Sequence, residues 1–306
     1  MRTATGVVRL GTRASRLARF QTDLVRRMLA GLLPALEFRT IVISTEGDRD
    51  TRTPLPEIGG KGVFTQELEA ALRAGVIDLA VHSLKDVPVE PSPGLTLAAI
   101  GMREDPRDVL LSARGWTIET LPPGAAVGTC STRRAAQLLA VRPDVRLPPL
   151  RGNVDTRVDK ARAGEFDAIV IAAAGVHRLG LASAITQYLP LDVMLPAPGQ
   201  GALAVQCRAD DDELVTQLHL LDDETVRTAT AAERGFLEGL GGGCAAPIAA
   251  FARIQDGQLQ VQGLVSSPDG QRQVRVTADG PADDGRRLGL TLAADARARG
   301  AEALLA

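Results

Sequence analysis

One cysteine stands directly behind three glycines, in the run GGGCAAP at residues 241–247. Glycine has no Cβ, so this loop can adopt positive φ angles and approach a bulky group closely while Cys244 presents its sulfur. No metal ligand or disulfide partner is adjacent in the sequence. The run therefore indicates a covalent attachment point, although a free cysteine buried in a turn after a helix would also fit it.

Five arginines lie where predicted strands pass into helices, within residues 11–15 (GTRAS), 128–134 (GTCSTRR) and 151–157 (RGNVDTR). Ligands of open α/β sheets bind at this carboxyl edge, so the three segments are expected to share one cleft. Arginine pairs with carboxylates or phosphates, helped by the positive ends of helices. Because neither the GxxxxGK(S/T) nor the GxGxxG nucleotide motif occurs, a polycarboxylate is the favoured ligand, although each arginine taken singly could be a surface salt-bridge partner. The five are Arg13, Arg133, Arg134, Arg151 and Arg157.

The segment HSLKDVP at residues 82–88 follows a predicted strand and holds a neighbouring lysine and aspartate. Asp86, expected among cationic groups, should stay ionised and could stabilise a developing cation or accept a proton. A surface turn is the plainer interpretation, and His82 is expected to be a structural histidine. Residues 48–60 show no helix or strand period, which is typical of a mobile loop over a cleft or of an ordinary surface loop.

Composition limits the class of protein. With 306 residues and 45% hydrophobic content, the chain suits two or three globular domains. No apolar run could span a bilayer and no signal-peptide pattern opens the chain, which predicts a cytoplasmic protein with no membrane partner. A net charge of −2, with one Trp and one Tyr, argues against a nucleic-acid partner. Three cysteines outside any CxxC pair and three scattered histidines predict no metal site.

The elements expected around these residues alternate between strands and helices, which is typical of an α/β fold. In the first hundred residues, strands are predicted at 7–10, 38–44, 77–81 and 95–100, with helices at about 15–32 and 63–74. A second set has strands near 108–112, 125–129, 145–149 and 167–172, with helices near 132–141, 153–163 and 175–181. A further strand at 202–207 is expected to return to the first domain.

The pattern changes after residue 223. A helix over about 223–240 ends at the glycine triplet, and three alternating strands follow with Asp-Gly hairpin signals at 256–257 and 269–270. An amphipathic helix at about 284–305 is expected to cover this sheet. The predicted fold class is α/β, with two doubly wound, periplasmic-binding-protein-like domains and a small C-terminal α+β domain with a three-stranded antiparallel sheet. The three domains are predicted at residues 1–101 with 201–220, 102–200, and 221–306.

Six motifs, in order along the chain, resemble those of the porphobilinogen deaminases, also called hydroxymethylbilane synthases. They are GTRAS at 11–15, GGKGVF at 59–64, HSLKDVP at 82–88, LRGNVDTR at 150–157, PAPGQG at 196–201 and the stretch from Glu233 to Pro247. The resemblance runs nearly end to end and implies a monomeric transferase of tetrapyrrole (heme and porphyrin) biosynthesis. Such an enzyme deaminates four porphobilinogen molecules, joins them head-to-tail on a covalently bound dipyrromethane, and releases hydroxymethylbilane by hydrolysis.

The resemblance also implies a role for each matching residue. Cys244 would carry the dipyrromethane cofactor through a thioether. Asp86 and Lys85 would be catalytic, with Asp86 stabilising the azafulvene cation that forms as ammonia leaves. Cofactor contacts would also come from Thr129, Ser131, Arg133, Arg134, Lys85 and Asp86. Substrate contacts would come from Arg13, Ser15, Lys61 on the lid, Phe64, Arg151, Arg157 and Gln200.

The sequence departs from the family pattern at a few positions. Cys130 and Thr132 flank Ser131 where the arginine pair is usually preceded by Ser-Ser-Leu. Glu57 stands at a lid position that is often basic, and Ala249 replaces a common glycine. None of these departures removes a residue assigned to chemistry.

Two other classes of protein remain open. A two-lobed binding module for a polycarboxylate ligand would have similar α/β halves but would not need Cys244. A cysteine acyltransferase would need a residue that activates the thiol, and no His–Asp or His–Asn arrangement is visible in the sequence. Only the deaminase predicts a covalent dipyrrole on Cys244.

Overall fold

The computed structural model describes residues 6–44, 65–243 and 246–305. The chain forms two compact units, one comprising Met1–Met102 with Ala202–Glu224 and the other Arg103–Gly201 with Thr225–Ala306. No helix in the described part of the chain is long and apolar enough to cross a membrane.

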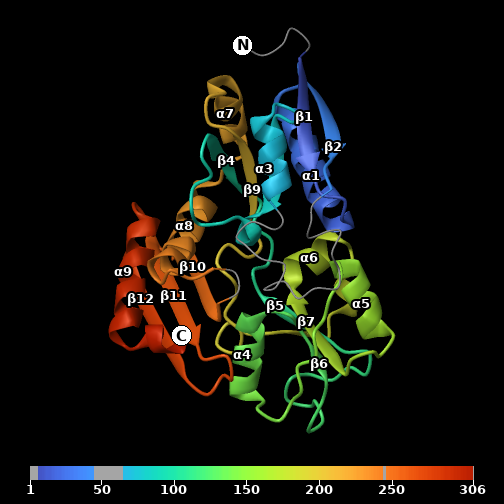
Figure 1. The fold of residues 1–306 in the computed structure, drawn as a ribbon, viewed down its shortest axis with the longest axis vertical. Helices are drawn as coiled ribbons and strands as arrows, with labels where there is room; N and C mark the ends of the chain where they lie inside the picture. Colours follow the sequence, from blue (N-terminus) through green and yellow to red (C-terminus); the bar gives the residue numbers. More distant parts are fainter. Residues whose placement is uncertain (1–5, 45–64, 244–245, 306) are drawn as a thin grey trace. The chain divides into compact units, whose positions relative to one another are not determined.

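The first unit is built on a five-stranded sheet in the order β2-β1-β3-β9-β4 (Figure 1). Strand β1 runs parallel to β2 and β3, whereas β9 runs antiparallel to both of its neighbours. Because β9 inserts between β3 and β4, the prediction that residues 202–207 return to the first domain is confirmed. The strands are β1 (Val7–Thr12), β2 (Glu37–Val42), β3 (Leu79–Ser83), β4 (Leu95–Gly101) and β9 (Leu203–Arg208).

Helices cover both faces of this sheet, because successive side chains of a strand point to opposite sides. Leu79 and Val81 of β3 belong to a buried cluster that includes residues of α1 and α7. Ala80, which lies between them, packs instead with residues of α3. The first unit is therefore doubly wound, as predicted. The helices are α1 (Arg16–Leu32), α3 (Gln66–Arg73) and α7 (Asp212–Leu218).

The second unit contains a four-stranded sheet in the order β6-β7-β5-β8. Its two faces are again covered, since Leu110 packs with α4 residues while Val109 and Leu111 pack with α5 and α6 residues. The strands are β5 (Asp108–Leu111), β6 (Val127–Gly128), β7 (Ala168–Ala172) and β8 (Gln187–Tyr188). The helices are α4 (Thr132–Val141), α5 (Val154–Arg162) and α6 (Ala173–Arg178).

One predicted strand of this sheet is wrong. Residues 145–149 form no strand, and their pairing is limited to a parallel bridge between Ala126 and Arg146. Pro148 and Pro149 lack the N–H groups that a ladder requires, so this part of the segment can accept hydrogen bonds from the sheet but cannot donate them. The segment still approaches the sheet, because the N–H of Thr129 donates to the carbonyl of Pro148 at 3.2 Å.

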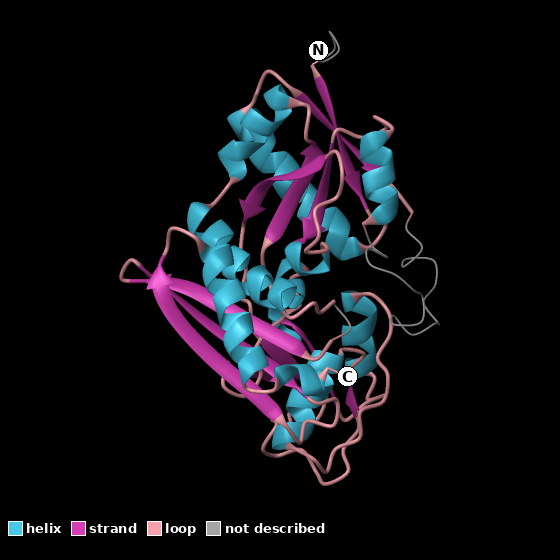
Figure 2. Cartoon of the chain, turned by 60° about the vertical axis from the view of Figure 1, so that its left-hand side comes forward, coloured by secondary structure: helices cyan, strands magenta, loops and turns pink. Residues whose placement is uncertain are grey.

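A three-stranded antiparallel sheet, β10-β11-β12, completes the second unit (Figure 2). Asp256 and Gly257 have φ angles of 52° and 75°, as a two-residue type I′ turn between β10 and β11 requires, so the predicted hairpin is confirmed. Helices α8 and α9 share one buried core with these strands. The elements are α8 (Glu224–Gly239), β10 (Ile248–Gln255), β11 (Gln258–Ser266), β12 (Gln273–Pro281) and α9 (Gly285–Ala298).

The small sheet packs directly on the four-stranded half of its unit. A Cβ built on Gly270, whose φ is +73°, would lie 2.3 Å from the carbonyl oxygen of Ala136 in α4. The turn before β12 therefore approaches the backbone of α4 closely, which only glycine allows. The predicted second and third domains thus lie in one compact unit, and the predicted three-domain boundaries stay a prediction.

Candidate active site

Arg13 and Ser15 follow β1 at the start of α1. Ser15 is the N-cap of this helix, and its Oγ accepts a hydrogen bond from the N–H of Ala18 at 3.3 Å. This satisfies one of the free N–H groups of the first turn and leaves the hydroxyl proton available to a ligand. Arg13 is half-buried. The sequence motif GTRAS thus joins a strand end, a cation and a helix N-terminus.

Lys85 and Asp86 lie in a short 3₁₀ turn, Leu84–Asp86, directly after β3. The N–H of Leu84 donates to the carbonyl of Ala202 at 3.0 Å, and the Leu84 side chain is fully buried. Lys85 and Asp86 remain half-buried. A buried leucine therefore anchors the turn, and the two polar side chains that follow it are only partly covered.

His82 precedes this turn and is only 5% exposed. Its Nε2 lies 3.0 Å from Oε1 of Gln206 in β9. Burial lowers the pKa of His82 to about 4, so the ring is neutral near pH 7. The hydrogen bond to Gln206 and the charges of Glu69 and Asp86 oppose this lowering of the pKa, while the charge of Arg13 adds to it. His82 is thus a neutral, hydrogen-bonded core residue of β3, directly before the turn that holds Lys85 and Asp86.

Arg133 and Arg134 begin α4, whose N-cap is Ser131. Ser131 Oγ accepts from the N–H of Arg134 at 3.4 Å, and Thr129 Oγ1 accepts from the N–H of Ser131 at 3.1 Å. The two arginines are 5% and 7% exposed. Burial lowers the pKa of Arg133, and the nearby carboxylate of Asp108 opposes that shift. The predicted arginine pair is therefore formed, but inside the protein.

Asp108, at the start of β5, holds both arginines and was not found by sequence reasoning. Its Oδ2 accepts from Arg133 Nη1 at 2.8 Å, and its Oδ1 accepts from Arg134 Nη2 at 2.8 Å and Nε at 3.0 Å. The same Oδ1 accepts from Nε2 of Gln200 at 3.0 Å. Gln200 is fully buried, so a substrate contact for it stays a prediction. A charged residue opening an otherwise apolar strand, RDVLL at 107–111, was the available signal.

Arg151 and Arg157 flank the start of α5. Gly152 has a φ of +112°, and a Cβ there would lie 3.0 Å from the Thr156 side chain, so the turn between them needs glycine. Nε of Arg157 donates to the Gly152 carbonyl at 2.7 Å, which folds this side chain back over the turn. Both arginines are half-buried. The motif RGNVDTR thus places two cations on one turn.

Not every predicted site residue belongs to the part of the chain that the structure describes. Cys244, Lys61 and Phe64 lie outside the described residues. The remaining predicted residues form two groups, one in each compact unit. Arg13, Ser15, Lys85 and Asp86 belong to the first unit, whereas Thr129, Ser131, Arg133, Arg134, Arg151, Arg157 and Gln200 belong to the second.

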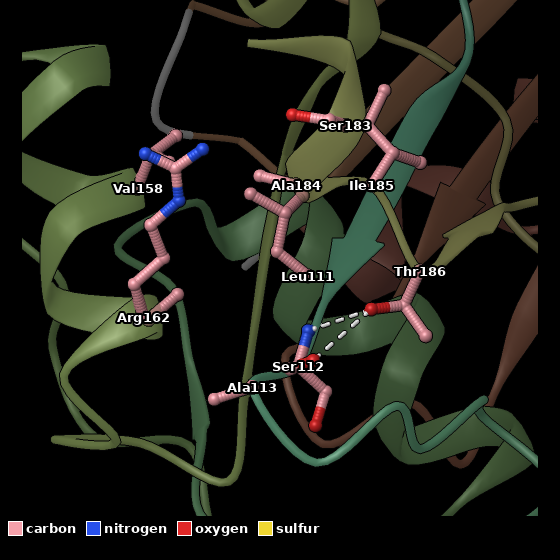
Figure 3. A pocket seen from close by; sticks show the side chains of 10 residues that line it. Leu111, Ser112, Ala113, Val158, Arg162, Ser183, Ala184, Ile185 and Thr186 are labelled. Atoms are coloured by element: carbon pink, nitrogen blue, oxygen red, sulfur yellow. Dashed lines mark hydrogen bonds between the residues drawn. The ribbon is translucent and has the colours of Figure 1, made fainter.

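A pocket of about 220 Å³ lies elsewhere in the second unit (Figure 3). It is lined by the end of β5, the last turns of α5 and residues 183–186, with Arg162 and Ser183 among its polar groups. None of the predicted site residues lines it. The described residues also contain no cluster of three or more His, Cys, Asp or Glu side chains that could hold a metal.

A buried ion pair supports the loop that carries Gln200. Glu233 of α8 is fully buried and accepts from Arg103 Nη2 and from the N–H groups of Gly199 and Ala252, at 2.7–2.8 Å. Arg103 Nε also donates to the carbonyl of Gln200 at 3.3 Å. Burial raises the pKa of Glu233, while Arg103 and the two N–H groups oppose the rise. The pair links α8 and β10 to residues 199–200.

We expect Arg103→Leu to lower the free energy of unfolding by about 3–5 kcal/mol, because Glu233 then remains buried without its cation. The loss should shrink as pH falls, since the raised pKa of Glu233 favours the protonated form in the folded state. Urea denaturation at several pH values measures both effects. Arg286→Leu, which breaks an exposed pair with Glu238, is the control and should change little; equal losses in both variants would contradict the assignment.

Two family models together match most of this chain. The model described as "Porphobilinogen deaminase, dipyromethane cofactor binding domain" matches residues 8–216, and "Porphobilinogen deaminase, C-terminal domain" matches residues 227–298. Among curated proteins, a porphobilinogen deaminase of Brevibacillus brevis is 47% identical over 302 residues, covering 98% of this chain and 97% of the relative. One of Roseiflexus sp. is 50% identical over 297 residues, covering 97% and 98%.

Solved structures that match part of this chain include the methionine binding protein MetQ. It is 11% identical, with a TM-score of 0.44, over 71% of this chain and 90% of that one. The BvgS periplasmic VFT2 domain of Bordetella pertussis is 17% identical, with a TM-score of 0.40, over 70% and 86%.

The matches to curated sequences decide between the classes that the motifs left open. Both domain models describe an enzyme family, so a binding module without chemistry is not favoured. The first model is that of a domain which binds dipyrromethane, so the predicted cofactor and the predicted transferase class are confirmed. The chain belongs to the porphobilinogen deaminase family.

Proposed function

We propose that this protein deaminates four porphobilinogen molecules, joins them head-to-tail on a dipyrromethane carried by Cys244, and releases hydroxymethylbilane by hydrolysis. The observation that carries the proposal is the family match over both domains, together with a buried arginine pair suited to carboxylates. When bound, the dipyrromethane supplies the pyrrole end to which substrate units are added. Residues of this chain would bind the cofactor and substrate carboxylates and stabilise the charge that develops in the reaction.

The residues of the second unit fit a cofactor that bears carboxylates. Arg133 and Arg134 are nearly buried and share the single carboxylate of Asp108, so the cluster carries more positive than negative charge. Such a site favours an added anion, because cations held away from water attract it strongly. Arg133 and Arg134 would hold cofactor carboxylates, and the hydroxyls of Thr129 and Ser131 would donate to them.

Asp86 and Lys85 would act on the reacting pyrrole. Asp86 lies in the turn directly after β3, half-buried, where its carboxylate can accept pyrrole N–H bonds and stabilise the cation that forms as ammonia leaves. The ammonium of Lys85, next to it, would pair with a carboxylate of the cofactor. A fixed charge in a partly buried turn needs little reorganisation during the reaction.

The remaining predicted residues would hold the substrate. We assign substrate carboxylates to Arg13, Ser15, Arg151 and Arg157, whose groups lie at strand ends and helix starts. We propose further substrate contacts for Phe64 and Gln200, and for Lys61, which would lie on the lid. We also propose a monomer in the cytoplasm that binds no nucleic acid, with support from its net charge of −2.

Mass spectrometry of the denatured protein tests the proposal most directly. A thioether survives unfolding, so the intact mass should exceed the sequence mass by that of a dipyrromethane, and peptide mapping should place the adduct on Cys244. Incubation with porphobilinogen should then add pyrrole units one at a time. A protein of unmodified mass that fails to take up porphobilinogen would refute the proposed function.

Replacing Arg133, Arg134, Arg151 or Arg157 by Leu should stall the reaction at different chain lengths. Each change removes charge-assisted hydrogen bonds worth roughly 1.5–3 kcal/mol, or about 10- to 150-fold in affinity for a chain intermediate. Because a growing chain must shift past fixed cations, intact masses should reveal enzyme with one, two or three extra pyrroles. Arg146→Leu, at an exposed arginine bound to the Gly124 carbonyl, is the control. Uniform losses without trapped species would mean that these arginines only stabilise the fold.

A further inference from the structure

Asp108 occupies a position that the proposed chemistry does not use directly. It is fully buried, and its backbone is fixed on both sides, by pairing with Ala172 of β7 and by the N–H of Leu189, which donates to its carbonyl at 3.0 Å. The carboxylate therefore projects from the interior of a sheet and not from a loop. A side chain held this way has little freedom to move, so it fixes the positions of the side chains that bind it.

The Asp108 carboxylate binds some of the N–H donors of the two arginines but not the others. The Asp108 carboxylate accepts hydrogen bonds from Nη1 of Arg133 and from both Nε and Nη2 of Arg134. Arg133 Nη1 also donates to the carbonyl of Leu195 at 2.6 Å. Within the part of the chain that the structure describes, no hydrogen-bond partner contacts Nε or Nη2 of Arg133 or Nη1 of Arg134. Each guanidinium is thus fixed on one side and retains donors on the other.

The charges of the cluster do not balance. Two guanidiniums, at 5% and 7% exposure, face one carboxylate at 0%, and Gln200 contributes an amide without charge. Within these four side chains one positive charge is left over. Burying an unpaired positive charge costs free energy unless an anion binds next to it.

We propose that Asp108 is the positioning residue of the arginine pair, holding Arg133 and Arg134 so that their remaining N–H groups receive one carboxylate of the bound dipyrromethane. The proposal rests on the proposed function. Without the Asp108 carboxylate, two neighbouring guanidiniums repel each other and lose the fixed orientation that bidentate recognition requires. Asp108 is assigned no contact with the reacting atoms.

Gln200 extends this arrangement toward α8. Its Nε2 donates to Asp108 and, at 2.7 Å, to the carbonyl of Pro106. The loop that carries it is held by Glu233 and Arg103. A continuous set of hydrogen bonds therefore runs from α8 through residues 199–200 to the arginine pair. The pair itself is contacted by Asp108 and by the carbonyl of Leu195, and Gln200 reaches it through Asp108.

The test compares Asp108→Asn and Asp108→Glu with wild type and with Asp105→Asn. Asp105 is a matched control, because it is also bound to an arginine, Arg107 at 2.7 Å, but does not touch the pair. For each purified protein, denaturing mass spectrometry gives the fraction that carries the dipyrromethane, thermal melting reports the fold, and kcat and KM are measured on the cofactor-bearing fraction.

We expect Asp108→Asn to reduce the cofactor-bearing fraction on the order of tenfold, the scale of one lost charge-assisted contact, while Asp105→Asn matches wild type. Asp108→Glu keeps the charge but moves it by one methylene. A positioning role predicts that this variant still folds yet shows a lower cofactor-bearing fraction or a raised KM. The Asp108→Glu variant tests the proposal even if Asp108→Asn fails to fold.

Wild-type occupancy and kinetics in a folded Asp108→Glu would overturn the inference, because Asp108 would then only neutralise buried charge. Wild-type behaviour of Asp108→Asn would overturn it as well. A wild-type protein that lacks the dipyrromethane mass and fails to take up porphobilinogen would instead refute the proposed function itself. The two failures are therefore distinguishable in one set of spectra.

Discussion

Cys244→Ser should yield folded protein that lacks the dipyrromethane and is essentially inactive. Attachment through a thioether needs a thiolate, and near neutral pH a serine alkoxide is far harder to form than a cysteine thiolate. The three preceding glycines are unchanged, so the backbone of the loop keeps its freedom. Intact mass and turnover with porphobilinogen measure the result.

The two other cysteines are the controls for this prediction. Cys207 is fully buried in β9, and Cys130 is partly buried directly before the N-cap of α4. Cys130→Ser and Cys207→Ser should both retain the adduct. Loss of the adduct in either of them, or normal turnover by Cys244→Ser, would show that the cofactor is attached elsewhere or is not needed.

Asp86→Asn should lower kcat on the order of 10²- to 10³-fold, the typical loss when one preorganised transition-state contact is removed. The amide keeps the shape of the side chain and its carbonyl can still accept a pyrrole N–H, but the charge that would stabilise the developing cation is gone. The buried Leu84 that anchors this turn is untouched, so the fold should persist. Steady-state kinetics on protein checked for the bound dipyrrole measures the effect.

Asp86→Glu separates charge from position at the same site. It keeps the carboxylate but moves it by one methylene, so it should carry the cofactor and retain more activity than Asp86→Asn. Glu90→Gln removes an exposed carboxylate four residues further on and should leave the rate near that of wild type. Near-normal turnover by Asp86→Asn would mean that the charge is not used and that another group handles the departing ammonia.

The sequence predicted most elements because their signals are local. Apolar periodicity located α1, α4 and α8 to within a residue at each end, and Asp-Gly at 256–257 located the β10–β11 turn. The strand predicted at 145–149 is absent, because Pro148 and Pro149 cannot donate the hydrogen bonds of a ladder. Motif order also identified the family, since six segments of specific composition seldom occur together by chance.

The partners of the site residues were decided only by the tertiary structure. Asp108 lies 25 residues from Arg133 and 92 from Gln200, and Glu233 lies 130 residues from Arg103. A hydrogen bond depends on the approach of individual atoms, and a pattern within one segment holds no information on which distant segment supplies the other atom. The sequence alone therefore identified the family and the cofactor, while the roles of the candidate site residues stay predictions. Only folding decided that the arginine pair is buried and shares one carboxylate, because burial and charge balance arise from contacts between segments far apart in the chain.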